Sequence, residues 1–495
     1  MKKLLLVCLL ALGAVLPMQA QRYLSEIFPS RTVIHDIYYA SNITIISGSP
    51  AADSMYYDVY RPMNDTLSQR PCVIVAPTGS FLPVPLNGQA TGDKRDSAMV
   101  NLCMKLAARG FVAIAFNYRK GWQPTSSNQE TRTGSLLQAA YRGIQDARTL
   151  VRHLRDDVAN NGNQHKINPN KIIVGGMGTG GYISLGVAYL DSYDEINLGK
   201  FLDSQGHSFV DTSLLGDVEG KWTRALNIGN YPNQSSDVSF AFNMGGAVGD
   251  STWIEAGETP SASVHSPNDP FAPYGFGPVI VPTTGDFVVD VSGSQGVQSR
   301  ATRLGVNSSY DQLVFGDAVS MSVATRNGGL NGLYPLFRPT PESAPWEEWD
   351  SAYWAQVPHP SGGSFTSVGM LTNPDMSHAK SITYLDSILA FVVPRIVCSM
   401  GLANCNLALN SDVATEQWTV GVYPNPSYTS INVSTDASNP LSSVVLTDLS
   451  GRQVKMIGGL KATDVRIDHS DLTPGMYFLT AYTRKGVQTE KVLLY

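Results

Sequence analysis

Short apolar runs alternate with amphipathic segments over the first three quarters of the chain. Apolar runs typical of buried strands lie at residues 72–76, 112–116 and 171–174, and residues 238–244 and 261–265 look like two more strands. Helical periodicity fills residues 97–109 and 136–154, and two alternating segments, 32–39 and 56–60, suit edge strands. Strands that alternate with helices predict an α/β fold, a mostly parallel sheet with helices on both faces. Such sheets bind ligands at the carboxyl ends of their strands.

Two stretches interrupt this alternation. Residues 190–236 are polar and partly helical, and residues 272–345 are rich in Gly, Pro, Ser and Val without clear helix signals. We expect both to be insertions over the upper edge of the sheet, as caps or lids, or else surface elaborations without a direct role. A last amphipathic helix at 377–393 is expected to stop at Pro394. The α/β domain is therefore predicted to span residues 21–405.

The end of the chain has a different pattern. Residues 406–420 form a polar linker, and residues 421–495 read as an all-β module. Its strand runs are separated by turn signals and lie at 430–433, 443–448, 465–467, 475–482 and 490–494. Short strands with regular turns predict a small β-sandwich.

The N-terminus reads as a secretory signal peptide over residues 1–20. Lys2 and Lys3 precede an apolar core at 4–15, and Met18-Gln19-Ala20 offers a cleavage site. No later segment has the ~18 uncharged apolar residues of a spanning helix, so we expect no transmembrane segment. The net charge is −6 without a long basic cluster, which argues against nucleic-acid binding.

Four cysteines follow the predicted cleavage site. Cys398 and Cys405 enclose a short loop, so we expect a disulfide between them in an exported protein. Cys72 and Cys103 could pair, although two buried thiols are an equally good interpretation. No second C-x-x-C or nearby histidine pair completes a zinc site, so we expect neither metal nor cofactor.

The C-terminal module carries four motifs in a fixed order. They are Tyr423-Pro424-Asn425-Pro426, Asp448-Leu449-Ser450-Gly451-Arg452, Leu472-Thr473-Pro474-Gly475-Met476-Tyr477 and Lys491-Val492-Leu493-Leu494. The module resembles the type A sorting domain of the Bacteroidetes type IX secretion system. The resemblance implies a Sec signal, crossing of the outer membrane by the type IX machinery, and a secreted or cell-surface location. The alternative is an ordinary Ig-like or carbohydrate-binding sandwich.

Seven residues after the strand run at 171–174 carry the main functional signal. Gly175-Gly176-Met177-Gly178-Thr179-Gly180-Gly181 has the spacing of a nucleophile elbow, G-x-S-x-G, but Gly178 stands where the serine belongs. The same glycines also satisfy the dinucleotide pattern G-x-G-x-x-G. That pattern needs an acidic residue about 20 positions on, after a second strand, and the acidic residues here come too soon and follow a helix. The elbow is therefore the favoured interpretation.

Around this segment, roughly residues 55–395 resemble the α/β-hydrolase family, nearest to the carboxylesterase and hormone-sensitive-lipase type. Asn117-Tyr118-Arg119 is similar to the N-Y-R of the family, and residues 77–81 are similar to its oxyanion loop. The resemblance implies that backbone N–H groups of Gly79, Ser80 and Thr179 stabilise an oxyanion. Pro77 and Thr78 depart from the usual His and Gly of that loop.

The resemblance also implies an acid and a base. Asp269 follows the strand run at 261–265, and His378 opens the last helix, so the chain order elbow, Asp, His is that of the family. The alternative is a turn aspartate and a helix-start histidine.

These features predict an exported, esterase-like α/β-hydrolase protein at the cell surface that lacks its nucleophile. It would be a pseudoenzyme or a binding protein for a small-molecule ester or surface ligand. The alternatives are an active carboxylic-ester hydrolase with an unconventional nucleophile and, less favoured, a structural surface protein.

Overall fold

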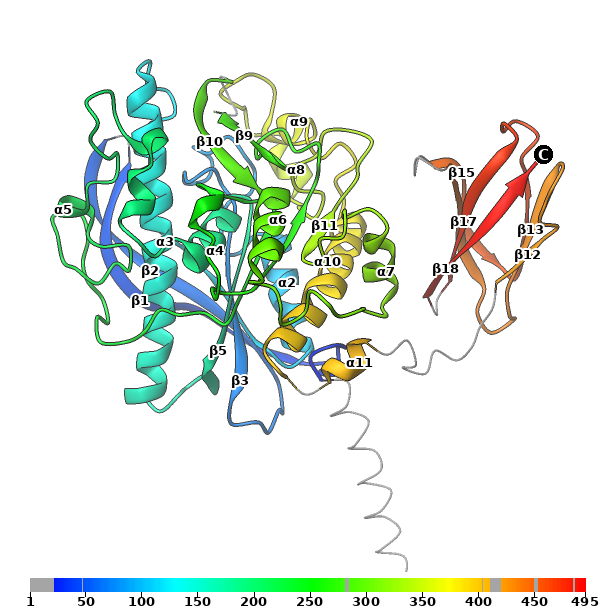
Figure 1. Cartoon of the computed structure of the whole chain (residues 1–495), viewed down its shortest axis with the longest axis horizontal. Helices are drawn as coiled ribbons and strands as arrows, with labels where there is room; N and C mark the ends of the chain where they lie inside the picture. The colour runs from blue at the N-terminus through cyan, green and yellow to red at the C-terminus, as the bar shows by residue number, and fades with distance from the viewer. Residues whose placement is uncertain are drawn as a thin grey trace, which may run out of the picture. The chain divides into compact units, whose positions relative to one another are not determined.

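An eight-stranded mixed sheet forms the centre of the larger of two compact units, which span residues 1–409 and 410–495 (Figure 1). The structure is a computed structural model that describes residues 22–46, 48–280, 285–402, 404–409, 420–448, 453–483 and 486–495. The predicted signal peptide and most of the predicted linker lie outside the described residues.

The strands of the central sheet lie in the order β1-β2-β4-β3-β5-β6-β8-β11. Their bounds are β1 (Arg31–Ile46), β2 (Ser49–Pro62), β3 (Arg70–Ala76), β4 (Val112–Phe116), β5 (Ile167–Met177), β6 (Phe240–Met244), β8 (Ser261–His265) and β11 (Leu333–Pro335). The β1–β2 and β2–β4 pairs are antiparallel, whereas all pairs from β4 to β11 are parallel. This arrangement is an α/β-hydrolase fold, as the sequence predicts.

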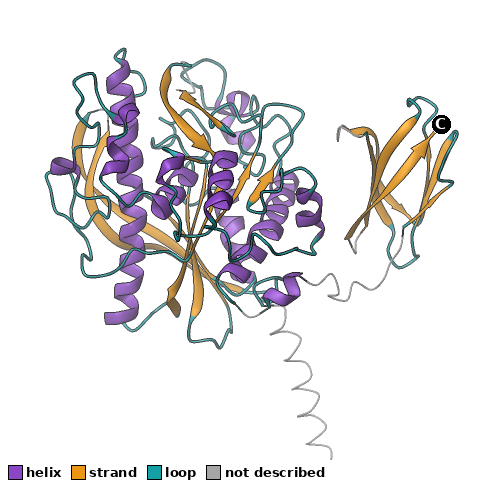
Figure 2. Ribbon diagram, in the orientation of Figure 1, coloured by secondary structure: helices purple, strands orange, loops and turns teal. Residues whose placement is uncertain are grey.

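Helices cover both faces of this sheet (Figure 2). The principal ones are α2 (Ser97–Ala108), α3 (Gln129–Asn160), α4 (Thr179–Tyr189), α6 (Ser294–Leu304) and α10 (His378–Ser399). Side chains alternate along β3: Ile74 packs into the core beneath α3, α4 and α6, whereas Val73 and Val75 pack into the core beneath α2 and α10. Both sheet faces are buried, which explains why these strands read as continuous apolar runs.

Two expectations about element bounds are corrected. Helix α10 does not stop at Pro394 but continues to Ser399, with both flanks of the proline buried in the core. Burial of this apolar surface offsets the hydrogen bond that proline removes. By length and composition α10 could cross a membrane, but 67% of its apolar window is buried inside the unit, as in a core helix of a globular domain.

The second correction concerns residues 272–345. They are not wholly an insertion, because β11 from this stretch forms the last strand of the central sheet, beside β8. The remainder includes β9 (Phe276–Ile280) and β10 (Phe287–Gly293), which pair with β7 (Ala247–Val248) in a separate three-stranded sheet. The smaller helices of the unit are α5 (Thr212–Leu215), α7 (Ala318–Ala324), α8 (Ser351–Trp354), α9 (Phe365–Gly369) and α11 (Cys405–Leu409). Three short 3-10 helices complete the set: η1 (Asp194–Asn197), η2 (Gly199–Phe201) and η3 (Ser251–Trp253).

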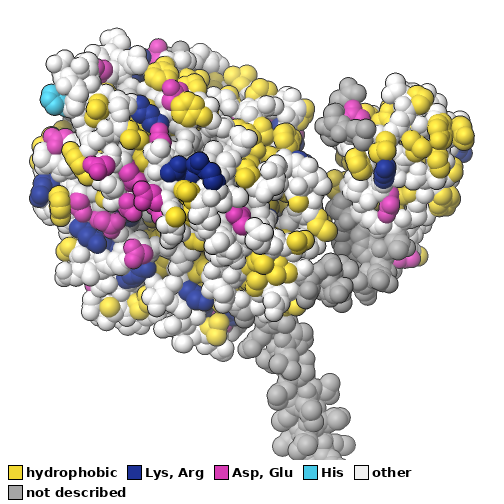
Figure 3. Space-filling model, in the orientation of Figure 1, with side chains coloured by type: hydrophobic (Ala, Val, Ile, Leu, Met, Phe, Trp, Pro, Cys, Tyr) yellow, Lys and Arg dark blue, Asp and Glu magenta, His cyan; other side chains and the backbone are white. Residues whose placement is uncertain are grey.

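The cysteines of the larger unit fall into two groups. Cys398 and Cys405 form a disulfide that ties the end of α10 to α11. Cys72 and Cys103 are free and buried. On the face drawn in Figure 3, several acidic side chains of the larger unit gather in one area, with basic side chains around them.

The smaller unit consists of two antiparallel sheets. One has the order β12-β13-β16 and the other β15-β14-β17-β18. The bounds are β12 (Gly421–Tyr423), β13 (Ser430–Ser434), β14 (Leu441–Thr447), β15 (Gln453–Ala462), β16 (Asp464–Asp468), β17 (Gly475–Thr483) and β18 (Gly486–Leu494). Alternate residues such as Ile431, Val433, Leu479 and Val492 form a common core, so the unit is a small β-sandwich.

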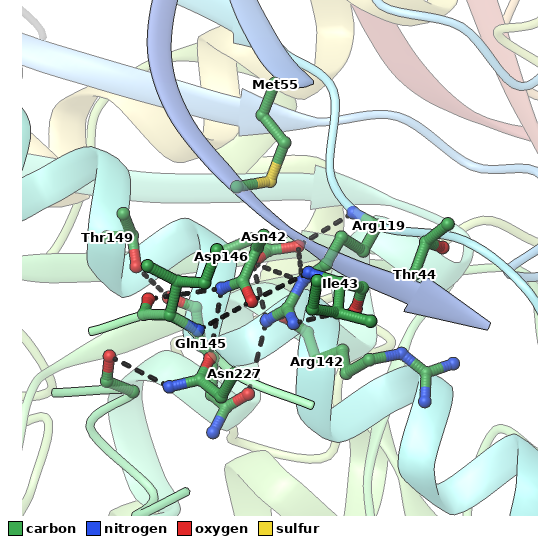
Figure 4. A network of polar contacts seen from close by, with 12 residues as sticks. Asn42, Ile43, Thr44, Met55, Arg119, Arg142, Gln145, Asp146, Thr149 and Asn227 are labelled. Carbon is green, nitrogen blue, oxygen red and sulfur yellow. Dashed lines mark hydrogen bonds and ion pairs between the residues drawn. The ribbon is translucent and has the colours of Figure 1, made fainter. Parts of the chain in front are cut away.

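A fully buried ion pair joins α3 to the sheet of the larger unit (Figure 4). Arg119, in the loop after β4, donates from Nε to Asp146 Oδ1 at 2.8 Å, and its backbone N–H donates to Oδ2 at 2.7 Å. Neither side chain has any exposed surface. The guanidinium also donates to the carbonyl oxygen of Ile43 on β1 at 3.1 Å, so one charge holds three segments together.

We expect Asp146→Ala to destabilise the larger unit by about 3–5 kcal/mol, because the guanidinium of Arg119 would stay buried without its anion. Urea unfolding followed by tryptophan fluorescence measures this change, since six of the seven tryptophans precede residue 410. The matched control is Asp156→Ala on the same helix, whose carboxylate hydrogen-bonds at the surface to Asn160. The control should change stability by less than about 1 kcal/mol.

Candidate functional site

The predicted nucleophile elbow is a tight turn between β5 and α4. Gly178 follows the last residue of β5 and precedes the first residue of α4, with φ 51° and ψ −118°. Its N–H donates to the carbonyl oxygen of Met244 on β6 at 2.8 Å. The strand, sharp turn and helix occur in the order that G-x-S-x-G requires.

The flanking glycines are needed for close packing. A Cβ at Gly176 would lie 1.9 Å from the carbonyl oxygen of Gly180, and a Cβ at Gly180 would lie 2.1 Å from that of Ala76. Backbone atoms cannot move aside as a flexible side chain can. The turn therefore brings α4 against β3 at a distance that only glycine permits.

Thr78 occupies the space that a nucleophile side chain would need. A Cβ at Gly178 would lie 2.2 Å from Thr78 Oγ1 and 3.0 Å from Thr78 Cβ. Thr78 belongs to the loop after β3, where the hydrolase pattern has glycine. The two departures noted in the sequence are thus complementary: one side chain fills the volume that the other lacks.

The predicted oxyanion residues lie around this point. Ser80 and Thr179 line the same cavity as Gly178, and Gly79 lies between Thr78 and Ser80 with φ 121°. Within the described residues, no hydrogen bond engages the backbone N–H groups of these three residues. The Thr179 hydroxyl lies 3.1 Å from the hydroxyl of Tyr118, whose burial raises its pKa, so the Thr179 oxygen is held by a neutral phenol.

Asp269 lies beside the elbow, but the protein already engages its carboxylate. The side chain is 2% exposed and follows β8. Oδ1 accepts hydrogen bonds from the backbone N–H groups of Phe271 and Ala272 at 2.7 and 3.1 Å, and Oδ2 lies 3.5 Å from Nε2 of His265. His265 is itself fully buried, with Nδ1 2.8 Å from the hydroxyl of Ser294.

His378 is not brought to Asp269. It is the first residue of α10, its side chain is 71% exposed, and its Nδ1 lies 2.9 Å from Oε2 of Glu348. Within the described residues no hydrogen bond or ion pair joins it to Asp269. Ser377 caps the helix by accepting from the N–H of Lys380, which fixes where α10 begins and leaves the side chain of His378 at the surface.

A different histidine, His359, lines the cavity and has no motif that marks it in the sequence. Its Nδ1 accepts a hydrogen bond from the N–H of Ser361 at 3.0 Å. Its Nε2 therefore carries the proton and donates to the carbonyl oxygen of Gly88, also at 3.0 Å. Both ring nitrogens are occupied, so neither is free to accept a proton from a hydroxyl.

The cavity above Gly178 has a volume of about 760 Å³. Its walls are mainly aliphatic and aromatic and come from α3, from the β9–β10 pair and from the loops after β3 and β11. Among the described residues, the cavity is lined by two carboxylic acids, Asp269 and Glu347, and by no lysine or arginine. The described residues also contain no cluster of three or more His, Cys, Asp or Glu that could hold a metal ion.

Comparisons with known proteins address the two units separately. Residues 421–495 match the family described as "Secretion system C-terminal sorting domain". A search of curated proteins finds no match to this sequence. The sorting domain implies handling by the type IX secretion machinery and secretion to the cell surface.

Among solved structures, esterase 2 of Thermogutta terrifontis phosphorylated by paraoxon is 16% identical, with a TM-score of 0.30, over 50% of this chain and 74% of that one. The apo form is 15% identical, with a TM-score of 0.30, over 50% and 75%. The propionate-bound form is 14% identical, with a TM-score of 0.28, over 47% and 74%. At such similarity these neighbours carry no information on the chemistry of this chain.

Because Thr78 fills the space beside Gly178, we expect Gly178→Ser to destabilise the protein by about 1–3 kcal/mol, including the cost of a side chain at positive φ. The double variant Gly178→Ser/Thr78→Gly should recover part of this loss, since it removes the clash. Urea unfolding of the single and double variants measures both effects.

Neither variant should hydrolyse p-nitrophenyl butyrate, because no free histidine lies beside residue 178 to accept the serine proton. Stoichiometric labelling of Gly178→Ser by a fluorophosphonate probe would contradict this expectation.

Proposed function

We propose that this protein is exported through a Sec signal peptide at residues 1–20 and the C-terminal sorting domain, and that its α/β-hydrolase unit binds an apolar molecule without hydrolysing it. The observation that carries the proposal is the position of Thr78, which takes up the volume of the absent nucleophile. A turn with glycine and a filled neighbouring space is a packed arrangement rather than an empty catalytic position.

The absence of a free base supports loss of hydrolysis. Serine hydrolysis needs a histidine that takes the proton of the nucleophile and an acid that orients that histidine. Here His378 pairs with Glu348 at the surface, and His359 uses both ring nitrogens on backbone groups. Asp269 lines the same cavity as Gly178, but the histidine beside it, His265, is buried and hydrogen-bonded to Ser294.

The size and walls of the cavity support ligand binding. Ligand sites are typically concave spaces of about 300–1,000 Å³ with apolar walls and few polar groups. Leu136, Leu137 and Ala140 of α3 face Val279, Val289 and other apolar residues across the cavity. An apolar ligand of moderate length would replace water along these walls, which favours binding by about 25 cal/mol per Å² of buried apolar surface.

The second candidate is a hydrolase with an unconventional nucleophile, and one observation favours it. The hydroxyl of Thr78 lies close to where a serine side chain would stand, and its oxygen has no hydrogen-bond partner within the described residues. A threonine hydroxyl without a base beside it is a weak nucleophile. Peptide mapping after treatment with a fluorophosphonate probe distinguishes the candidates, because the proposal expects no adduct and the alternative expects one at Thr78.

Binding is tested by calorimetric titration of the chain from residue 22 onward with 1-decanol. We expect Ala140→Trp to weaken binding at least about tenfold, because the indole would project from α3 into the cavity. Ala159→Trp, at an exposed position on the same helix, is the matched control and should bind as the parent does. No binding by the parent, or equal loss in both variants, would favour a purely structural role in the surface layer.

A further inference from the structure

One wall of the cavity carries a carboxyl group between two indoles. Trp346, Glu347 and Trp349 lie on the loop after β11, and all three line the cavity. The next acidic residue, Glu348, faces the other way and pairs with His378 at the surface. The short sequence Trp346-Glu347-Glu348-Trp349 thus places one carboxyl in the cavity and one outside it.

Glu347 has no cationic partner. It is only 6% exposed, and within the described residues no lysine, arginine or histidine forms an ion pair with it. Thr91, which lines the same cavity, provides a hydrogen bond to the side chain. Burial of an ionised carboxylate without an opposing charge is unfavourable, so Glu347 stays protonated at neutral pH unless a cation lies beside it.

A second, independent sign of a missing partner is the indole of Trp346. The residue is fully buried and lines the cavity, and its Nε1–H has no hydrogen-bond acceptor within the described residues. The Nε1–H of Trp349 likewise lacks an acceptor. Buried donors in native proteins almost always find acceptors, so both N–H groups call for an acceptor at this wall. An amine cation supplies none, so the charge of the ligand is argued from Glu347 and from the indole rings.

From this constellation we infer that the cavity binds an apolar molecule bearing a protonated or quaternary amine, with Glu347 as its counter-ion and the indoles of Trp346 and Trp349 beside the cation. The inference rests on the proposed function. Tryptophan is the aromatic side chain that attracts cations most strongly, and the attraction grows when the site is shielded from water. The aliphatic walls toward α3 would take the apolar part of the ligand.

The charges around Glu347 favour a cation over an anion. Asp96, the residue before α2, is the nearest other carboxyl and accepts hydrogen bonds from the N–H groups of Gly92 and Asp93 at 2.6 and 2.8 Å. Burial, and then the charge of Asp96, raise the pKa of Glu347 to about 8. The other titratable groups near Glu347 and Asp96 are Asp93, Lys120, Glu348, His359, Asp269 and His378. No lysine or arginine of the described residues lines the cavity, so the wall keeps a negative potential once Glu347 ionises.

The test is calorimetric titration of the chain from residue 22 onward with three decyl probes at concentrations below micelle formation: decyltrimethylammonium, 1-decanol and decanoate. We expect the ammonium to bind about tenfold or more tightly than the alcohol, and decanoate to bind most weakly. The charge of the quaternary ammonium does not change with pH. Its affinity should therefore rise about tenfold between about pH 7 and pH 9, because Glu347 loses its proton in that interval.

Glu347→Gln should remove both the preference for the ammonium and its rise with pH, while 1-decanol binds within about twofold of the parent. Glu348→Gln, next in the chain but outside the cavity, is the matched control and should keep both. Thermal melts of the variants establish that each is folded. The inference is overturned if decanoate or 1-decanol binds as tightly as the ammonium, or if the pH dependence persists in Glu347→Gln.

The proposed function and this inference fail in different ways. If 1-decanol binds and decyltrimethylammonium binds no more tightly, the proposed apolar binding site is supported and the amine inference is wrong. If none of the three probes binds, both fall together.

Discussion

The buried ion pair between Arg119 and Asp146 is the interaction on which the larger unit depends. Two charges without solvent contact are costly unless every donor and acceptor is used. Here the guanidinium bonds the carboxylate of α3, the carbonyl of Ile43 on β1 and that of Leu226 in the segment before β6. The pair therefore fixes the position and rotation of α3 on the sheet. The shape of the cavity depends on this placement, because the N-terminal half of α3 forms one of the cavity walls.

The backbone around Gly178 has the geometry of a nucleophile elbow, but residue 178 has no side chain that could act as a nucleophile. Gly176 and Gly180 maintain the close approach of α4 to β3 that a nucleophile elbow needs, and Gly178 keeps the positive φ of its central residue. A glycine accepts this conformation with less strain than any other residue. Once no side chain is needed at 178, the loop after β3 can carry a larger residue at 78, and Thr78 packs into that volume. The turn keeps its shape because its constraints lie in the backbone, whereas serine hydrolysis would depend on side chains.

The sequence predicts well what local pattern determines. Val112–Phe116 has the bounds expected of it, because a fully buried strand reads as an apolar run between turn signals. Ser261–His265 also has its expected bounds. It fails where long-range packing decides. The three residues of β11 are too few to show the alternating pattern of a strand, and they join the sheet through their pairing with β8. His378 was expected at the site from chain order, but its direction depends on how residues 336–377 fold over the sheet edge. Glu347 has no local motif at all, and only the structure shows that it lines the cavity while its neighbour Glu348 pairs with His378.

The cavity wall around Glu347 also bears on whether this site has merely decayed. A wall that served stability alone would gain from an apolar residue at 347, since replacing buried charged groups by packed apolar ones is often neutral or stabilising. An indole N–H without an acceptor is also unfavourable, because it loses its hydrogen bond to water on folding and gains none in the protein. Thr78 packs closely against Gly178, whereas the wall around Glu347 keeps polar groups that the described protein itself does not satisfy. Close packing at Thr78, together with polar groups that lack partners where a ligand would lie, is typical of a binding site.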